Sequence, residues 1–135
     1  KRYAIDLRHD PSPKAVTTEA LFLVESRLLK GWAAQESCVV MGRSGFFIFR
    51  DTPNTFKVFV ECNNMDKRIE RVCKKKGISE EEAKKAIAEV DKSRETYTQR
   101  FSGKSRYDTR NYDLVINTAD MTEEEAAELI LKAIG

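Results

Sequence analysis

The spacing of apolar residues changes from helical to strand-like early in the chain. From Thr17 or Thr18 to about Gln35, apolar side chains recur three and four positions apart, which predicts an amphipathic helix with a threonine N-cap. The short apolar run 38–41 then stops at Gly42. A continuous apolar run of this length predicts a buried strand with an abrupt end.

The middle of the chain predicts one strand and two helices. Residues 56–60 are apolar enough for a strand, and residues 66–76 have the pattern of a basic helix that Gly77 ends. Residues 79–82 have capping-box character and open a long helix that reaches about Tyr97.

The last part of the chain predicts a third strand and a final helix. The strand covers residues 112–117, and Thr122 with Glu125 caps a helix that runs through Ile134. Residues 45–49 are apolar too, and their pattern fits either a helical turn or a strand. Because helices separate the strands, we expect parallel pairing and an α/β layered fold.

The composition fits one compact domain without a strong overall charge. Of 135 residues 41% are apolar, and 24 basic side chains nearly cancel 22 acidic ones, which argues against nonspecific nucleic-acid binding. Three cysteines without metal-ligand spacing indicate free thiols and a cytoplasmic protein, and the lack of a long apolar run argues against membrane insertion. Residues 1–14 predict a loop, and because the chain opens on Lys1 we expect the natural polypeptide to start earlier.

Polar residues that directly follow predicted strands are the first candidates for a binding site. Ligands of a parallel sheet gather beyond the carboxyl ends of its strands. Gly42 lets the backbone approach an anion there, and the guanidinium of Arg43 offers a two-pronged grip on phosphate, with Ser44 next to it. A surface arginine after a strand is the alternative. Asn117 and Thr118 follow the last strand in the same way.

Cations gather on and after the two middle helices. Positioned cations stabilise the negative charge that spreads over a transferred phosphoryl group, and a helical pair with a basic loop could close them over a nucleotide. We reserve this role for the arginines, because lysines near a helix C-terminus are explained by the dipole. Asp91 could orient a lid arginine, meet a sugar hydroxyl, or simply lie on the surface. The cations are Lys67, Arg68, Arg71, Lys74, Lys75, Lys76, Lys92, Arg94, Arg100, Lys104, Arg106 and Arg110.

Several motifs occur in an order that points to one family. Gly42 and Arg43 end a strand, an Asp-Thr-Pro turn follows at 51–53, an Asp-Lys-Ser-Arg motif occupies 91–94, and the strand at 112–118 precedes an acidic-capped helix. In this order and spacing the chain resembles the cytidylate kinases, and the last strand looks like their cytidylate kinase-like bacterial subfamily. The resemblance covers about residues 18–134.

The resemblance implies a reaction and roles for individual residues. It implies ATP-dependent phosphoryl transfer to a nucleoside monophosphate, with CMP and dCMP as candidate acceptors and Mg²⁺ bridging the donor phosphates. Arg43 would hold the acceptor's phosphate, and Arg68, Arg71 and Arg94 would be catalytic cations on a lid of about residues 66–110.

The remaining positions concern substrate contacts. Ser44 and Asp91 would contact the acceptor, and Asn117 with Thr118 would lie near the adenine of ATP. Ser44 stands where the better known cytidylate kinases carry Asp, so the acceptor base is open. No residue is expected to bind a metal directly.

The resemblance also implies a three-layer parallel sheet of the P-loop kinase type that lacks its first strand. No Gly-x-x-x-x-Gly-Lys-Ser/Thr loop occurs in residues 1–135. In the family, the strand before that loop lies between those that match 39–41 and 56–60, so its absence would leave two interior edges unpaired. We expect a single incomplete kinase domain, inactive alone, that an upstream segment or another chain completes.

Two other functions stay open at this point. A noncatalytic nucleotide-binding or regulatory relative would keep the fold without the donor site. A small RNA-binding module would use the basic segment 92–110, in which Tyr97, Phe101 and Tyr107 are interleaved with cations. That segment is short, and it lies where a kinase lid would fall.

Overall fold

The computed structural model describes residues 17–135, so the loop predicted over residues 1–14 lies outside the described residues. None of the helices within this range is long and apolar enough to cross a membrane. In chain order the elements are α1 (Thr18–Gln35), α2 (Gly45–Ile48), β1 (Val58–Glu61), α3 (Met65–Lys76), α4 (Glu80–Ser102), the 3-10 turn η2 (Thr109–Asn111), β2 (Leu114–Asn117) and α5 (Glu123–Ile134).

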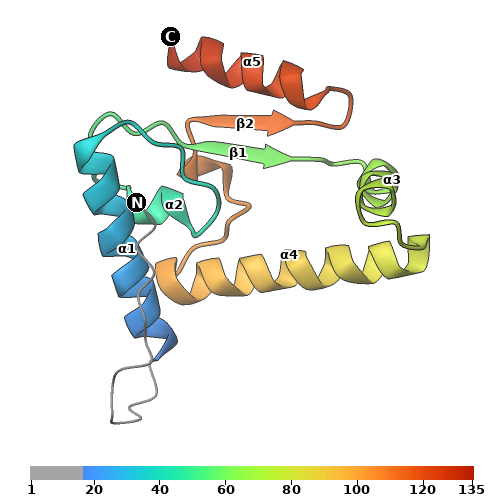
Figure 1. The fold of residues 1–135 in the computed structure, drawn as a ribbon, viewed down its shortest axis with the longest axis horizontal. Coiled ribbons are helices and arrows are strands. Elements are labelled where there is room, and N and C mark those ends of the chain that lie inside the picture. The colour runs from blue at the N-terminus through green and yellow to red at the C-terminus, as the bar shows by residue number, and fades with distance from the viewer. Residues whose placement is uncertain (1–16) are drawn as a thin grey trace.

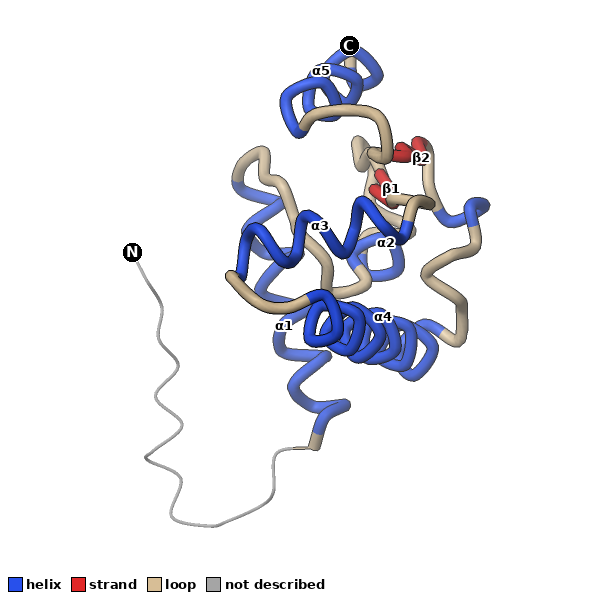
Figure 2. Tube along the Cα trace, turned by 90° about the vertical axis from the view of Figure 1, so that its right-hand side faces the viewer, coloured by secondary structure: helices blue, strands red, loops and turns tan. Residues whose placement is uncertain are grey.

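A parallel pair of strands organises the fold. β1 and β2 pair from Val58 opposite Leu114 to Glu61 opposite Asn117, and α3 and α4 form the crossover between them. α5 lies on one side of the strand pair and α4 on the other, while α3 lies beyond the carboxyl ends of both strands (Figure 1 and Figure 2). The predicted parallel pairing and α/β class are confirmed.

The predicted helix ends are present because their capping interactions form locally. Ser79 and Glu82 make a reciprocal capping box at the start of α4, and Thr122 and Glu125 make another at the start of α5. Gly77 ends α3 in the left-handed conformation, with φ of 64°. α4 continues past its predicted end.

The strand predicted at residues 38–41 is wrong. This segment forms no strand, and Val39 and Met41 are 87% and 83% exposed. A strand needs a neighbour to pair its backbone groups, and within residues 17–135 β1 pairs only with β2. The ambiguous segment that follows forms the helical turn α2.

Two small clusters hold the middle of the molecule together. Ile69, Ala83 and Ile87 are buried between α3 and α4, so these two helices form one packed unit. Phe59 of β1 stacks on Tyr112 with ring centroids 5.0 Å apart. This stack fixes the loop after α4 against the strands.

Candidate functional site

An ion pair between α3 and α4 forms the best-defined polar contact of the site. Arg68 donates two hydrogen bonds of 2.8 Å, one to each carboxylate oxygen of Asp91. Both side chains are about three-quarters buried, at 28% and 25% exposed. Two-pronged pairing holds the guanidinium in one plane, so α3 and α4 present Arg68 in a fixed orientation.

Further arginines surround the same carboxylate. The hydrogen bonds from Arg68 hold the pKa of Asp91 below its usual value, and the charges of Arg106 and Arg94 lower that pKa further. Arg94 lies one turn along α4 from Asp91 and is exposed. The guanidinium of Arg106 lies 5.5 Å from the centre of the Phe59 ring. Three cations thus act on the Asp91 carboxylate, and the Glu95 carboxylate also lies close to Arg106.

Arg106 was among the cations of the sequence but was not selected as a site residue. Its backbone N–H donates to Glu95 at 3.0 Å, which ties the loop after α4 back onto that helix. The sequence feature that could have identified Arg106 as a site residue is its position shortly after Gly103, the residue that ends α4. A loop that returns from a helix end brings its side chains back toward that helix.

Arg71 extends from α3 to the end of β2. It donates to the Thr118 hydroxyl at 3.2 Å and to the Thr118 carbonyl at 2.7 Å. The Asn117 carboxamide oxygen accepts from the backbone N–H groups of Asn63 and Ala119, both at 3.2 Å. The structure therefore brings Arg71 together with the Asn117–Thr118 loop at the carboxyl edge of the strands.

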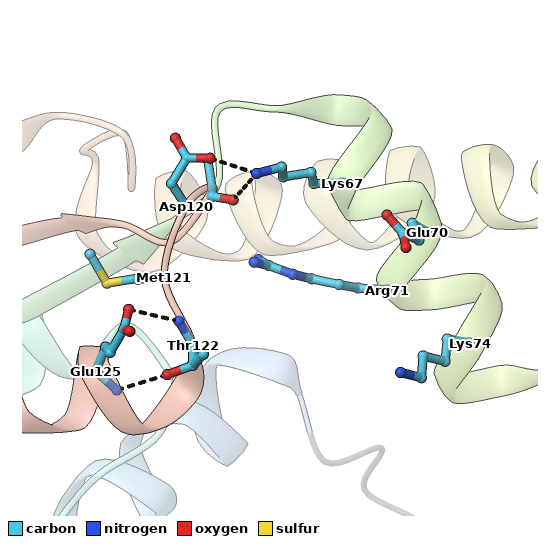
Figure 3. A pocket seen from close by; sticks show the side chains of 9 residues that line it. Lys67, Glu70, Arg71, Lys74, Asp120, Met121, Thr122 and Glu125 are labelled. Carbon is cyan, nitrogen blue, oxygen red and sulfur yellow. Dashed lines mark hydrogen bonds and ion pairs between the residues drawn. The ribbon is translucent and has the colours of Figure 1, made fainter.

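A cavity of about 480 Å³ opens beside this contact, between α3 and the loop from β2 to α5. Figure 3 shows the Arg71 side chain extending from α3 into the space opposite Thr122. Lys67 borders the cavity as well, and its ammonium group donates to the Ala119 carbonyl at 2.7 Å and pairs with Asp120. Three basic and three acidic side chains line this cavity, namely Lys67, Arg71, Lys74, Glu70, Asp120 and Glu125. Its place at the carboxyl end of the strands, rather than its charge, makes it a candidate ligand site.

Arg43 and Ser44 lie at a third place, beside the C-terminal half of α4. The Arg43 side chain is 60% exposed, and its nearest carboxylate oxygen, on Glu25 of α1, is 3.9 Å away. Ser44 is buried, and its hydroxyl shares a 2.9 Å hydrogen bond with that of Thr98. The Ser44 side chain is thus directed inward, while Arg43 is directed outward.

The predicted site residues therefore form three groups along α3 and α4. Arg68, Asp91 and Arg94 form one group, and Arg71, Asn117 and Thr118 form the second. Arg43 and Ser44 form the third, fewer than two helical turns along α4 from Asp91. The roles proposed for all eight residues stay predictions.

The described residues contain no preformed metal centre. Between residues 17 and 135 there is no group of three or more His, Cys, Asp or Glu side chains that could hold an ion. The three cysteines are free thiols.

Parallel strands with a basic helix such as α3 beyond their carboxyl ends (Figure 1) are typical of α/β proteins that bind anionic ligands at that edge. Comparison with known proteins is more specific. The model of the cytidylate kinase-like family matches residues 2–120. The chain belongs to this family.

One of two curated relatives carries the name that this assignment suggests. The chain is 31% identical over 132 residues to a cytidylate kinase of Methanopyrus kandleri, which covers 96% of this chain and 63% of that protein. It is 33% identical over 101 residues to a uronate isomerase of Corynebacterium glutamicum, which covers 74% of this chain and 19% of that protein. The chain thus spans less than two thirds of both relatives, and the isomerase match is too partial to transfer that activity.

A solved structure shares the fold. The crystal structure of an uncharacterized protein from Eubacterium ventriosum superposes with a TM-score of 0.79 at 25% identity, covering 86% of this chain and 73% of that one. The arrangement of β1, β2 and the helices around them is therefore found in a second protein.

Proposed function

We propose that this chain is part of an enzyme that transfers the terminal phosphoryl group of ATP to a nucleoside monophosphate, with CMP or dCMP as candidate acceptors. The observation that carries this proposal is the arrangement around Asp91, where Arg68 is held by two hydrogen bonds and Arg94 and Arg106 add their charges. Phosphoryl transfer needs such positioned cations more than it needs a covalent catalyst. Family membership supports nucleotides as the substrates.

Each group of residues would have one task. Arg43, which is exposed and loosely paired, would bind the acceptor's phosphate. Arg68 and Arg94 would stabilise the migrating phosphoryl group, and Asp91 would keep Arg68 aligned or meet the acceptor's sugar. Ser44 would act through the backbone it shares with Arg43, because its hydroxyl is occupied.

ATP, the phosphoryl donor, would bind at the group formed by Arg71, Asn117 and Thr118. The loop of Asn117 and Thr118 and the cavity beside it would take the adenine side of ATP, since they lie at the carboxyl edge of the strands. Arg71, which contacts this loop, would act with Arg68 and Arg94 as a cation for the migrating phosphoryl group. Bound Mg²⁺ would neutralise charge on the donor phosphates during transfer. We assign no residue between 17 and 135 to that ion.

We further propose a three-layer sheet of the P-loop kinase type. Residues 1–135 would form one incomplete domain with a lid of about residues 66–110, and the phosphate-loop strand would come from an upstream segment or another chain. Two observations support this. Val39 and Met41 leave apolar surface exposed, and among residues 17–135 β1 is paired along one edge only. A strand inserted beside β1 would cover the apolar surface of Val39 and Met41 and would pair with the second edge of β1.

A noncatalytic nucleotide-binding relative is the second candidate, because residues 1–135 contain no glycine-rich phosphate loop. The RNA-binding hypothesis has less support from the structure. Phe101 stacks on Phe22 with centroids 4.4 Å apart, and Tyr97 packs against both rings. The Phe101 and Tyr97 rings are therefore engaged within the protein, and of the three aromatic residues only Tyr107, 48% exposed, is open to a base.

A panel of phosphotransfer assays tests the proposal. The natural full-length polypeptide is incubated with ATP, Mg²⁺ and each common ribo- and deoxyribonucleoside monophosphate, and diphosphate formation is measured. We expect one acceptor, CMP or dCMP, to be preferred. Binding of monophosphate without any turnover would favour the noncatalytic relative, and neither binding nor turnover would refute both nucleotide-based candidates.

A further inference from the structure

The turn formed by Gly42, Arg43 and Ser44 has an unusual backbone. All three φ angles are positive, at 68°, 57° and 52°. A residue with a side chain rarely adopts this left-handed region, and two in succession persist only where the surroundings hold them. The buried hydrogen bond from Ser44 to Thr98 is such a contact. Thr98 of α4 thus fixes the backbone from which Arg43 projects.

Tyr97, the residue before Thr98, has a buried hydroxyl without a hydrogen-bond partner. The hydroxyl lies close enough to the Arg43 guanidinium and the Glu25 carboxylate for each to act on its pKa, but it forms a hydrogen bond of ordinary length and angle with neither. Burial, with the charge of Glu25, raises the pKa of Tyr97, so the group stays a neutral hydroxyl at neutral pH. An unpaired buried hydroxyl is unfavourable, so a hydrogen bond from a nearby donor such as Arg43 would stabilise it.

The Tyr97 ring is held in place by its neighbours. Phe101 meets it edge-on at 4.8 Å between centroids, and Phe22 of α1 does so at 6.1 Å. Because these contacts restrict the ring, the hydroxyl cannot easily turn away from Arg43. By contrast, the long and mostly exposed Arg43 side chain is free to move, since an exposed pair at 3.9 Å contributes little.

We propose that the Tyr97 hydroxyl is a positioning group for Arg43. In the resting protein Arg43 lies near Glu25, and when an acceptor phosphate binds, the guanidinium leaves Glu25 and donates one hydrogen bond to Tyr97. A guanidinium has five N–H donors, so one can go to the tyrosine oxygen while others grip the phosphate. This inference rests on the proposed function, because it takes Arg43 to be the acceptor-phosphate ligand.

Substitution of Tyr97→Phe in the full-length polypeptide tests the role, because it removes the hydroxyl and keeps the ring contacts. We expect the KM and Kd for the acceptor monophosphate to rise about tenfold, as for loss of one hydrogen bond to a charged group. The kcat at saturating acceptor and the KM for ATP should stay at their wild-type values. Ser26→Ala is the matched control, since it removes a hydroxyl from α1 whose bond to the Phe22 carbonyl lies within that helix.

A second variant tests the exchange of partners. Glu25→Gln removes the resting counter-charge of Arg43, so we expect monophosphate affinity to increase about threefold, the effect of losing one competing exposed ion pair. Unchanged or weaker binding in this variant would show that Glu25 does not compete for the arginine, and would overturn the exchange.

The outcomes separate this inference from the function on which it rests. If wild type turns over a monophosphate and Tyr97→Phe has the same acceptor KM, the positioning role is refuted and the proposed function stands. A variant that loses kcat and both affinities together would show a purely structural tyrosine and refute the role too. If wild type neither binds nor phosphorylates any monophosphate, both ideas fail.

Discussion

Two arginine–carboxylate pairs in this molecule differ in hydrogen bonding, in the distance between the charged groups and in exposure to solvent. Arg68 and Asp91 make two hydrogen bonds of 2.8 Å between packed helices and are about three-quarters buried. Arg43 and Glu25 are 3.9 Å apart, and the arginine side chain is mostly exposed. The first pair resists solvent and salt, whereas the second is screened by both.

The difference indicates different tasks for the two arginines. A buried two-pronged pair is suited to preorganisation, because its cation needs no rearrangement when a ligand arrives. A loose exposed pair is suited to ligand capture, since an incoming phosphate can replace the carboxylate at small cost. The substitutions below test this contrast, from the largest expected effect to the smallest.

Arg43→Ala should have the largest effect, and it should affect binding alone. In the full-length polypeptide we expect monophosphate affinity to fall about a hundredfold, since a charged two-pronged contact is lost. Stability should change by less than about 0.5 kcal/mol, because the pair with Glu25 is exposed. Calorimetric titration and urea unfolding measure the two effects. Arg27→Ala, which removes an exposed arginine of α1, is the control, and equal affinities in all three proteins would remove Arg43 from the site.

Asp91→Asn should instead lower stability. It leaves Arg68 without its charged partner, and we expect a loss of about 1–2 kcal/mol, between the values of exposed and fully buried pairs. Urea unfolding measures it. Asp120→Asn is the matched control, because Asp120 pairs with Lys67 but is 92% exposed, and its unfolding midpoint should stay close to wild type. A similar midpoint for both variants would contradict the contrast between buried and exposed pairs.

The buried hydroxyl pair of Ser44 and Thr98 should couple the Arg43 turn to α4. Ser44→Ala and Thr98→Val should each cost about 1 kcal/mol, and the double variant should cost little more than either alone. A double-mutant cycle in urea measures this coupling. Additive costs would show that the two hydroxyls act independently. A loss of acceptor selectivity in Ser44→Ala without loss of stability would instead support direct contact with substrate.

The pH dependence of stability should carry the smallest signal. The pKa of Asp91 is lowered in the folded protein, chiefly by Arg68, so its contribution is complete above the ordinary aspartate pKa and is lost as the pH falls through the folded value. The stability difference between wild type and Asp91→Asn should thus be constant from neutral pH down to about pH 4 and shrink below it. Urea unfolding at several pH values checks this, and a difference that grows on acidification would contradict the pairing.

The sequence predicted best what neighbouring residues decide among themselves. The capping boxes at Ser79 and Thr122 and the helix stop at Gly77 all formed as expected. Each depends on contacts within one helical turn, so residue type and spacing carry nearly all of the information. The strand predicted for residues 38–41 did not form. A strand needs a neighbouring strand to pair its backbone groups, and the residues of the run itself do not determine whether such a strand is present.

For the candidate site, the sequence supplied the residues but not their partners. It selected Arg68 and Asp91 separately, and they lie 23 positions apart in the chain. It also passed over Arg106, which acts on the same carboxylate from the loop beyond α4. Pairing over such distances follows from how α3 and α4 pack, which no local pattern encodes.

By itself, then, the sequence determined the four long helices, most of their ends, the α/β class and the family to which the motifs belong. Only the tertiary structure decided that Arg68 is held by two hydrogen bonds to Asp91 while Arg43 is loosely paired with Glu25. It also decided that the buried hydroxyl of Tyr97 lies near Arg43. The physical reason is that hydrogen bonding along a helix is local, whereas burial and ion pairing depend on which surfaces meet when the chain folds.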